Sequence, residues 1–108
     1  MNPKGFTTRV LNVPYSKSDP YGALQMPVYF STAFEFSNAD DLSAAFMGTK
    51  PAHVYSRSSN PTVEYFELRI KDMTGAPSVT ACASGMAAIS NVIMTTLAAG
   101  DTILTTRY

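Results

Sequence analysis

Two short groups of residues in this chain are suited to holding an anion. The first is Tyr55-Ser56-Arg57, which is followed by Asn60-Pro61-Thr62, and the second comes later, at Ala83-Ser84-Gly85-Met86. The phenol of Tyr55 and the planar guanidinium of Arg57 can both give directed hydrogen bonds to phosphate oxygens. The residue types in the first group therefore predict a contribution to a phosphate site.

The second group stands where an apolar, strand-like run passes into a pattern with helical periodicity. If Ser84 caps a helix there, the amides of Gly85 and Met86 lie unpaired at the positive end of that helix. Gly85 has no Cβ, so an anion can approach its backbone closely. This segment therefore predicts a second half of the same phosphate site.

Neither group is expected to hold a cofactor alone. A helix N-terminus offers an anion at most about 2 kcal/mol, and each hydrogen bond to a charged group adds about 1.5 to 3 kcal/mol. Tyr55 and Arg57 acting together with the Ser84-Gly85-Met86 turn could anchor a dianionic phosphate. Taken singly, a Ser-Gly capping turn or an isolated arginine is weak support for a site.

Other residue types that often carry chemistry form no pattern in this sequence. Cys82 is the only cysteine, which excludes an internal disulfide, and its apolar neighbours favour a buried residue over a reactive thiol. His53 is expected to be an ordinary loop histidine. The sequence contains neither a cluster with metal-ligand spacing nor a Ser/His/Asp arrangement nor a glycine-rich nucleotide fingerprint.

The elements that would position these groups can be predicted from periodicity and from capping residues. A short helix is expected over residues 38–47, with Ser37 as its cap. A longer helix should start at Pro61 behind an Asn60 cap. The apolar positions expected to face a core share a helical spacing in each of the two later helices: Val63, Phe66, Ile70 and Met73 in one, and Met86, Ile89, Val92 or Ile93, and Leu97 in the other.

Two short strands complete the predicted architecture. Residues 78–83 and 102–106 are rich in residues that favour strands, and they flank the helix that follows Ser84. The order strand, helix, strand predicts an α/β domain with a largely parallel sheet. Residues 1–25 contain too many prolines and glycines for a long helix or strand, so they are expected to form an extended arm.

Composition limits the classes of partner. The chain has eight basic and eight acidic residues, so no net charge would recruit nucleic acid or an anionic membrane surface. Residues 73–100 carry no formal charge, yet polar residues and glycines interrupt them too often for a membrane span. A content of 45% apolar and 15% charged residues is typical of a soluble, cytoplasmic protein.

The run YSRSSNPT followed by SGMAAI resembles the Cys/Met-metabolism enzymes that use pyridoxal phosphate, the transsulfuration or cystathionine γ-synthase-like family. The similarity extends over about residues 7–108 and includes the segments 26–34, 66–67 and 73–76. It implies a fold-type I enzyme with a mostly parallel sheet flanked by helices. Residues 1–60 would then form an N-terminal arm and inter-subunit loop region, and residues 61–108 the start of the cofactor-binding domain.

The resemblance also assigns roles. Pyridoxal 5'-phosphate is the implied cofactor, with Ser84, Gly85 and Met86 serving their own subunit and Tyr55 and Arg57 serving a neighbouring one. The active protein would be at least a dimer, with a tetramer favoured. The family's Schiff-base lysine and its ring-stacking aromatic would lie beyond Tyr108, so no catalytic residue is assigned here and this chain alone is expected to be inactive.

The implied reaction is γ-replacement on an O-acylhomoserine in methionine and cysteine metabolism. γ-Elimination from methionine or cystathionine is the alternative within the family, and in both cases the substrate is an amino acid. An interpretation from another class is a non-catalytic module that binds a simple anion, or assists assembly, with the same helix N-terminus.

Overall fold

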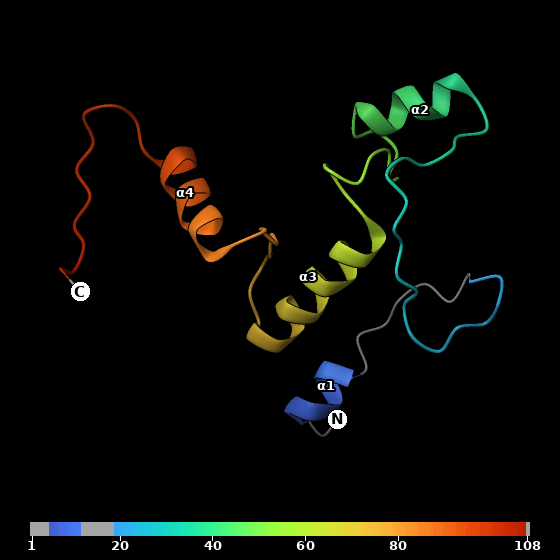
Figure 1. The fold of residues 1–108 in the computed structure, drawn as a ribbon, viewed down its shortest axis with the longest axis horizontal. Coiled ribbons are helices and arrows are strands. Elements are labelled where there is room, and N and C mark those ends of the chain that lie inside the picture. Colours follow the sequence, from blue (N-terminus) through green and yellow to red (C-terminus); the bar gives the residue numbers. More distant parts are fainter. Residues whose placement is uncertain (1–4, 12–18, 108) are drawn as a thin grey trace.

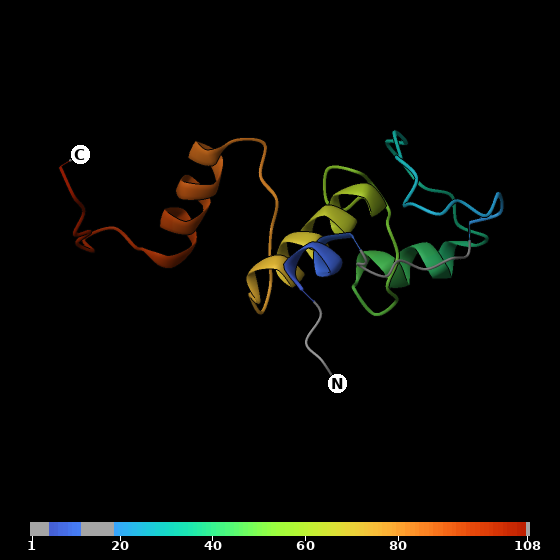
Figure 2. The same cartoon turned by 90° about the horizontal axis from the view of Figure 1, so that it is seen from below.

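The computed structural model describes residues 5–11 and 19–107 of the chain. Within these ranges four helices follow one another, namely α1 (Phe6–Leu11), α2 (Ala39–Phe46), α3 (Pro61–Thr74) and α4 (Gly85–Thr96). α1 and α2 lie near opposite ends of α3, whereas α4 stands apart from all three (Figures 1 and 2). The fold therefore consists of a cluster around α3 and a separate C-terminal limb.

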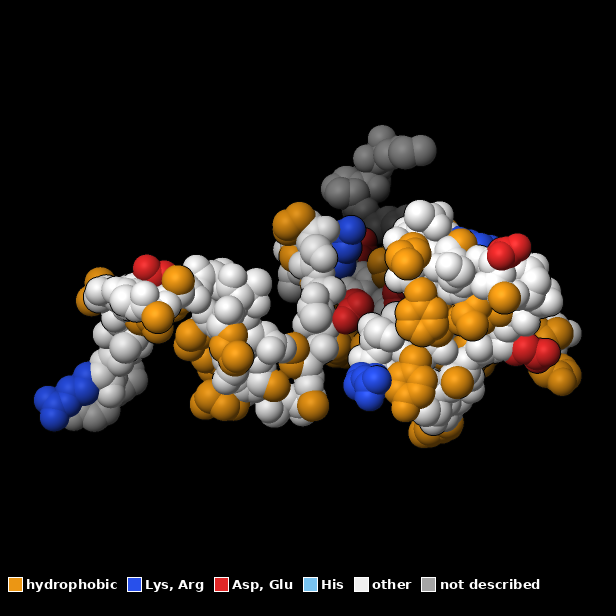
Figure 3. All heavy atoms as spheres, turned by 90° about the horizontal axis from the view of Figure 1, so that it is seen from above, with side chains coloured by type: hydrophobic (Ala, Val, Ile, Leu, Met, Phe, Trp, Pro, Cys, Tyr) orange, Lys and Arg blue, Asp and Glu red, His pale blue; other side chains and the backbone are white. Residues whose placement is uncertain are grey.

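The chain is far more open than a folded domain of its length. Its radius of gyration is 18.0 Å and its accessible surface is 9223 Å². A compact chain of this size would have a radius of about 13 Å and a surface of about 5,800 Å². Hydrophobic side chains are open to solvent over both parts of the molecule (Figure 3). The structure thus contains no closed hydrophobic core in its described residues.

The apolar stripes predicted on α3 and α4 are accordingly not buried. Phe66 on α3 is 53% exposed and Met86 on α4 is 69% exposed. A helix buries its apolar face only against another layer, and no other described helix contacts α4. The prediction of burial is wrong for the described part of the chain, because none of its segments covers these faces.

α3 has the ends that the sequence predicts. The side chain of Asn60 accepts a hydrogen bond from the Thr62 amide at 2.8 Å, and Pro61 occupies the first helical turn. Gly75 ends the helix with φ 72°, a left-handed conformation that glycine adopts without a steric penalty. The carboxylate of Glu67 accepts the Ala81 amide at 2.7 Å, which ties the following segment to this helix.

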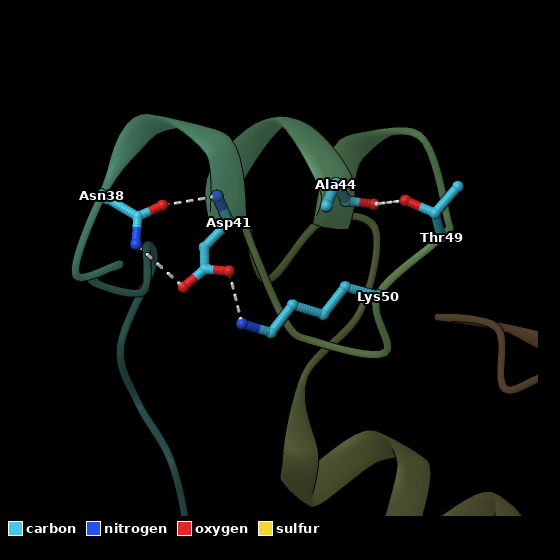
Figure 4. A network of polar contacts seen from close by, with 5 residues as sticks. All are labelled: Asn38, Asp41, Ala44, Thr49 and Lys50. Carbon is cyan, nitrogen blue, oxygen red and sulfur yellow. Dashed lines mark hydrogen bonds and ion pairs between the residues drawn. The ribbon is translucent and has the colours of Figure 1, made fainter.

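α2 begins one residue later than expected, and Asn38 rather than Ser37 is its cap. Asn38 has an extended backbone, and its side chain accepts the Asp41 amide at 2.8 Å. After the helix, the Thr49 hydroxyl donates to the Ala44 carbonyl at 3.0 Å, and Lys50 returns to pair with Asp41 at 2.6 Å (Figure 4). One carboxylate thus connects the start of α2 to the chain that follows its end.

The expected extended arm is wrong for residues 6–11, which form α1. A helix this short is marginal in water by itself. It is stabilised by α3, because the Arg69 guanidinium donates two hydrogen bonds, of 3.1 and 2.8 Å, to the Val10 carbonyl. The parts of the expected arm at residues 1–4 and 12–18 lie outside the described residues.

The strands expected at residues 78–83 and 102–106 are not formed, and the described ranges contain no strand longer than an isolated bridge. That bridge is antiparallel and joins Ala33 to Tyr55. A strand requires a neighbour to pair its backbone groups, and neither segment has one here. Cys82, expected to be a buried strand residue, is instead half-buried, and its sulfur accepts from the Asn91 amide group at 3.5 Å.

Among the residues that the structure describes, none of the helices is long and apolar enough to cross a membrane.

The ion pair of α2 leads to a prediction about titration. The hydrogen bond from Lys50 is the largest cause that holds the pKa of Asp41 below its usual value of 3.8. A carboxyl with a lowered pKa stabilises the fold above its unfolded pKa, and that contribution disappears as the pH falls through the folded pKa. In Lys50→Met we expect the pKa of Asp41 to rise toward 3.8, measured by NMR titration of the carboxyl carbon.

Lys71→Met is the matched control for this titration, since Lys71 lies on α3 and the ion pair of Asp41 is with Lys50. It should leave the Asp41 titration where it is. An equal displacement in both variants would show that the general charge of the chain, rather than the Lys50 contact, sets this pKa.

Candidate functional site

The loop that carries Tyr55 and Arg57 is held on both sides of Tyr55 by backbone hydrogen bonds. The Phe34 amide donates to the Val54 carbonyl at 3.2 Å, and the Ser56 amide donates to the Thr32 carbonyl at 2.8 Å. The Tyr55 carbonyl in turn accepts the amides of residues 58 and 59 at 3.0 and 3.1 Å. A tight turn anchored to residues 32–34 therefore presents the first group of candidate residues.

Tyr55 and Arg57 present their side chains together. The Arg57 guanidinium lies over the Tyr55 ring, 4.9 Å from its centroid, which is a cation–π contact. Both residues are exposed, and no carboxylate of the described chain forms an ion pair with Arg57. The cation is thus ordered by an aromatic surface while its charge remains available to an external anion.

The N-terminus of α4 has the predicted form. Ser84 has an extended backbone, and its hydroxyl accepts the Ala87 amide at 3.1 Å. The first helical bond runs from the Ala88 amide to the Ser84 carbonyl, so the amides of Gly85 and Met86 precede it and have no acceptor within the described residues. These two amides are directed donors at the positive end of a helix dipole.

Gly85 leaves room for an anion at this helix end. A Cβ placed on Gly85 would meet no atom within 4 Å. Free amide donors and open space therefore occur at the same place, as an anion site at a helix N-terminus requires. Ser84, Gly85 and Met86 are therefore suited to accept an anion, and Tyr55 and Arg57 form a second group suited to one.

A single chain does not bring the two groups together. The loop before α3 and the start of α4 are separated in both ribbon views (Figures 1 and 2). Each half of the candidate site is formed locally, and each remains open toward solvent.

The sequence did not predict that side chains at the start of α3 would bind the backbone of Tyr29. The Asn60 side-chain amide donates to the Tyr29 carbonyl at 3.1 Å, and the Thr62 hydroxyl accepts the Tyr29 amide at 2.8 Å. Both backbone polar groups of Tyr29 are therefore satisfied by side chains from one helix end. The only available signal was the Asn-Pro-Thr triplet, which predicts a helix cap but not the distant segment that the cap holds.

His53 has a more specific place than an ordinary loop histidine. Its Nδ1 lies 3.0 Å from the Ser59 hydroxyl, and its Nε2 lies 3.2 Å from a Glu64 carboxylate oxygen. Its ring also contacts that of Phe34, with centroids 5.7 Å apart. His53 therefore links the turn to α3. In the described part of the chain, no group of three or more metal-ligating side chains is found.

Comparison with known proteins places the sequence in a family. Residues 7–108 match the model of the Cys/Met metabolism PLP-dependent enzyme family. The chain is 40% identical to an L-methionine gamma-lyase of Pseudomonas putida over 93% of its own length and 25% of that protein. It is also 40% identical to an O-acetyl-L-homoserine sulfhydrylase of Corynebacterium glutamicum, over 94% of its length and 23% of the relative.

A third relative, an O-succinylhomoserine sulfhydrylase of Pseudomonas aeruginosa, is 40% identical over 82% of the chain. The chain spans about a quarter of the length of the curated relatives it matches. The family resemblance of the YSRSSNPT and SGMAAI motifs is thereby confirmed. With a family model matching nearly the whole sequence, this chain belongs to the pyridoxal-phosphate-dependent enzymes of Cys/Met metabolism.

Proposed function

We propose that the chain forms two half-sites for pyridoxal 5'-phosphate, and that a complete site arises between two copies. The Ser84-Gly85-Met86 turn would hold the phosphate of its own subunit, and Tyr55 with Arg57 would reach the phosphate of the neighbouring subunit. The observation that supports this most directly is that each half presents unused donors while the two lie apart within one chain. A homo-oligomer brings such halves together without changing either of them.

The fold implied by this proposal is the start of a fold-type I domain. Residues 61–108 would begin the cofactor-binding α/β domain, and residues 1–60 would form the arm and the inter-subunit loop region. Segments 78–83 and 102–106 would become strands when neighbouring strands pair with them. The exposed apolar faces of α3 and α4 support this, because both need a further layer. We also propose a cytoplasmic protein that is at least a dimer, with a tetramer favoured.

The proposed reaction is γ-replacement on an O-acylhomoserine by the full-length protein. The cofactor supplies an electron sink that permits bonds at the substrate's carbon chain to break. This chain contributes the binding and orientation of the phosphate, which fixes where the reactive part of the cofactor lies. Two relatives named as O-acylhomoserine sulfhydrylases support this assignment. A relative named L-methionine gamma-lyase, equally similar at 40% identity, supports γ-elimination as the second candidate.

Arg57→Ala should weaken cofactor retention in the full-length protein. Loss of a hydrogen bond to a charged group costs about 1.5 to 3 kcal/mol, which corresponds to about a tenfold to hundredfold higher dissociation constant. Equilibrium dialysis against pyridoxal 5'-phosphate measures the change. Arg9→Ala, which removes the same charge from α1, is the control and should bind normally. Equal affinity of Arg57→Ala and the unaltered protein would remove Arg57 from the site.

A mixing experiment tests whether the site is shared between subunits. Gly85→Val fills the space in front of the α4 amides, and Arg57→Ala removes the cation, so each variant should retain little cofactor. In a mixed dimer, one site combines the intact turn of one subunit with the intact Arg57 of the other. Random mixing should therefore restore cofactor to about a quarter of all sites. No recovery after unfolding and joint refolding would indicate that both groups serve the same subunit.

Product analysis distinguishes the candidate reactions. With an O-acylhomoserine and sulfide, the full-length protein should release the acyl group and form a sulfur-containing amino acid. Methionine and water should give a 2-oxo acid, ammonia and methanethiol, the leaving group from Cγ, only if elimination is the main reaction. A protein that binds cofactor at neither half-site and converts neither substrate would instead be the anion-binding or assembly module.

A further inference from the structure

The side chain of Asn60 makes three hydrogen bonds, which use both donors of its nitrogen and satisfy its oxygen. Its oxygen accepts the Thr62 amide at 2.8 Å, and its nitrogen donates to the Tyr29 carbonyl at 3.1 Å and to the Ser56 hydroxyl at 2.9 Å. It is 6% exposed and is the one buried residue in the described ranges. In so open a chain, a buried amide with partners for both its nitrogen and its oxygen fixes the position of each segment it contacts.

The other helix caps do not have this second function. The Ser84 hydroxyl caps α4 by accepting the Ala87 amide. Asn38 caps α2, and its nitrogen bonds to Asp41 of the same helix at 3.3 Å. Serine and aspartate cap helices about as well as asparagine, but neither has a nitrogen that donates two hydrogen bonds. We call the two hydrogen bonds that the Asn60 nitrogen donates, to the Tyr29 carbonyl and the Ser56 hydroxyl, the tether. The tether, and not the cap, therefore explains why asparagine occupies position 60.

The tether ends at the residue between Tyr55 and Arg57. Ser56 accepts from Asn60, and its own hydroxyl donates to the Ser31 carbonyl. The Ser56 amide donates to the Thr32 carbonyl at 2.8 Å. Ser56 is thus held from two sides, by residues 31–32 and by the start of α3, which leaves the backbone little freedom to turn the adjacent side chains elsewhere.

We infer that Asn60 is a positioning residue for cofactor binding, which acts through Ser56 to aim Tyr55 and Arg57 at the phosphate. This rests on the proposed function of those two residues. An ordered loop binds more tightly than a loose one because less conformational entropy is lost on binding. Asn60 itself need not touch the cofactor, and its contribution appears only through the residues it orients.

The first test is Asn60→Ser in the full-length protein. Serine keeps the cap, removes the tether and introduces no charge near the phosphate. We expect about a tenfold higher dissociation constant for pyridoxal 5'-phosphate, from the loss of two neutral hydrogen bonds. In the cofactor-free protein, amide hydrogen exchange over residues 54–59 should be faster. Asn38→Ser is the matched control, since it changes an asparagine cap without a tether, and it should affect neither measurement.

A double-mutant cycle with Arg57→Ala separates positioning from general support of the fold. If Asn60 acts through Arg57, Asn60→Ser should weaken binding much less in the Arg57→Ala background than alone. An unchanged effect in that background would overturn the inference, because the loss would then be independent of the residue being positioned. Normal affinity of Asn60→Ser, with Arg57→Ala impaired, would also overturn it while leaving the proposed function intact.

Ser56→Ala provides a second variant should Asn60→Ser fail to fold. It removes the far end of the tether and leaves the Asn60 cap and the Tyr29 contact in place. It should reproduce the weaker binding and the faster exchange of residues 54–59, and normal values for both would refute the inference. If Arg57→Ala alone has no effect on cofactor binding, the proposed function fails first, and the role of Asn60 fails with it.

Discussion

The described structure depends most on one buried amide, the side chain of Asn60. It joins the turn at Ser56 and the first residues of α3, which are close in sequence, to the chain at Tyr29, which lies 31 residues before Asn60. A buried polar group is tolerated only when its partners are present, so breaking any one contact leaves the others under-satisfied. This requirement, rather than hydrophobic packing, holds Tyr29, the turn at Ser56 and the start of α3 in one arrangement.

The rest of the chain is organised by its helix ends. α3 begins with a cap and ends at a left-handed glycine, and α4 begins with a cap whose next two amides remain unpaired. Their apolar faces stay exposed because no second layer covers them. Helices without such a layer gain little stability from burial. Their ends are instead stabilised by local caps, and their positions by a few long-range polar contacts.

The proposed function rests on two incomplete anion-binding groups that lie apart within one chain. The stacked Tyr55–Arg57 pair and the open end of α4 each offer donors to an anion, and neither supplies enough for a cofactor by itself. The chain belongs to a family whose members use pyridoxal phosphate, which carries a phosphate group that such donors can bind. Under the proposed function, placing the two halves on different regions of the chain would make cofactor binding depend on assembly, because a complete site would then require a second copy.

The sequence by itself determined the features that depend on neighbouring residues. The caps at Asn60 and Ser84 and the stop at Gly75 follow from contacts within a few residues, and the family followed from two motifs. The cap of α2 was misplaced by one residue because Ser37 and Asn38 are both good caps. Tertiary structure alone decided that residues 78–83 would not pair as a strand, that Phe6–Leu11 would form a helix against Arg69, and that Asn60 would hold Tyr29. Each of these outcomes depends on partners far away in the chain or outside it, and residue types and spacing do not specify such partners.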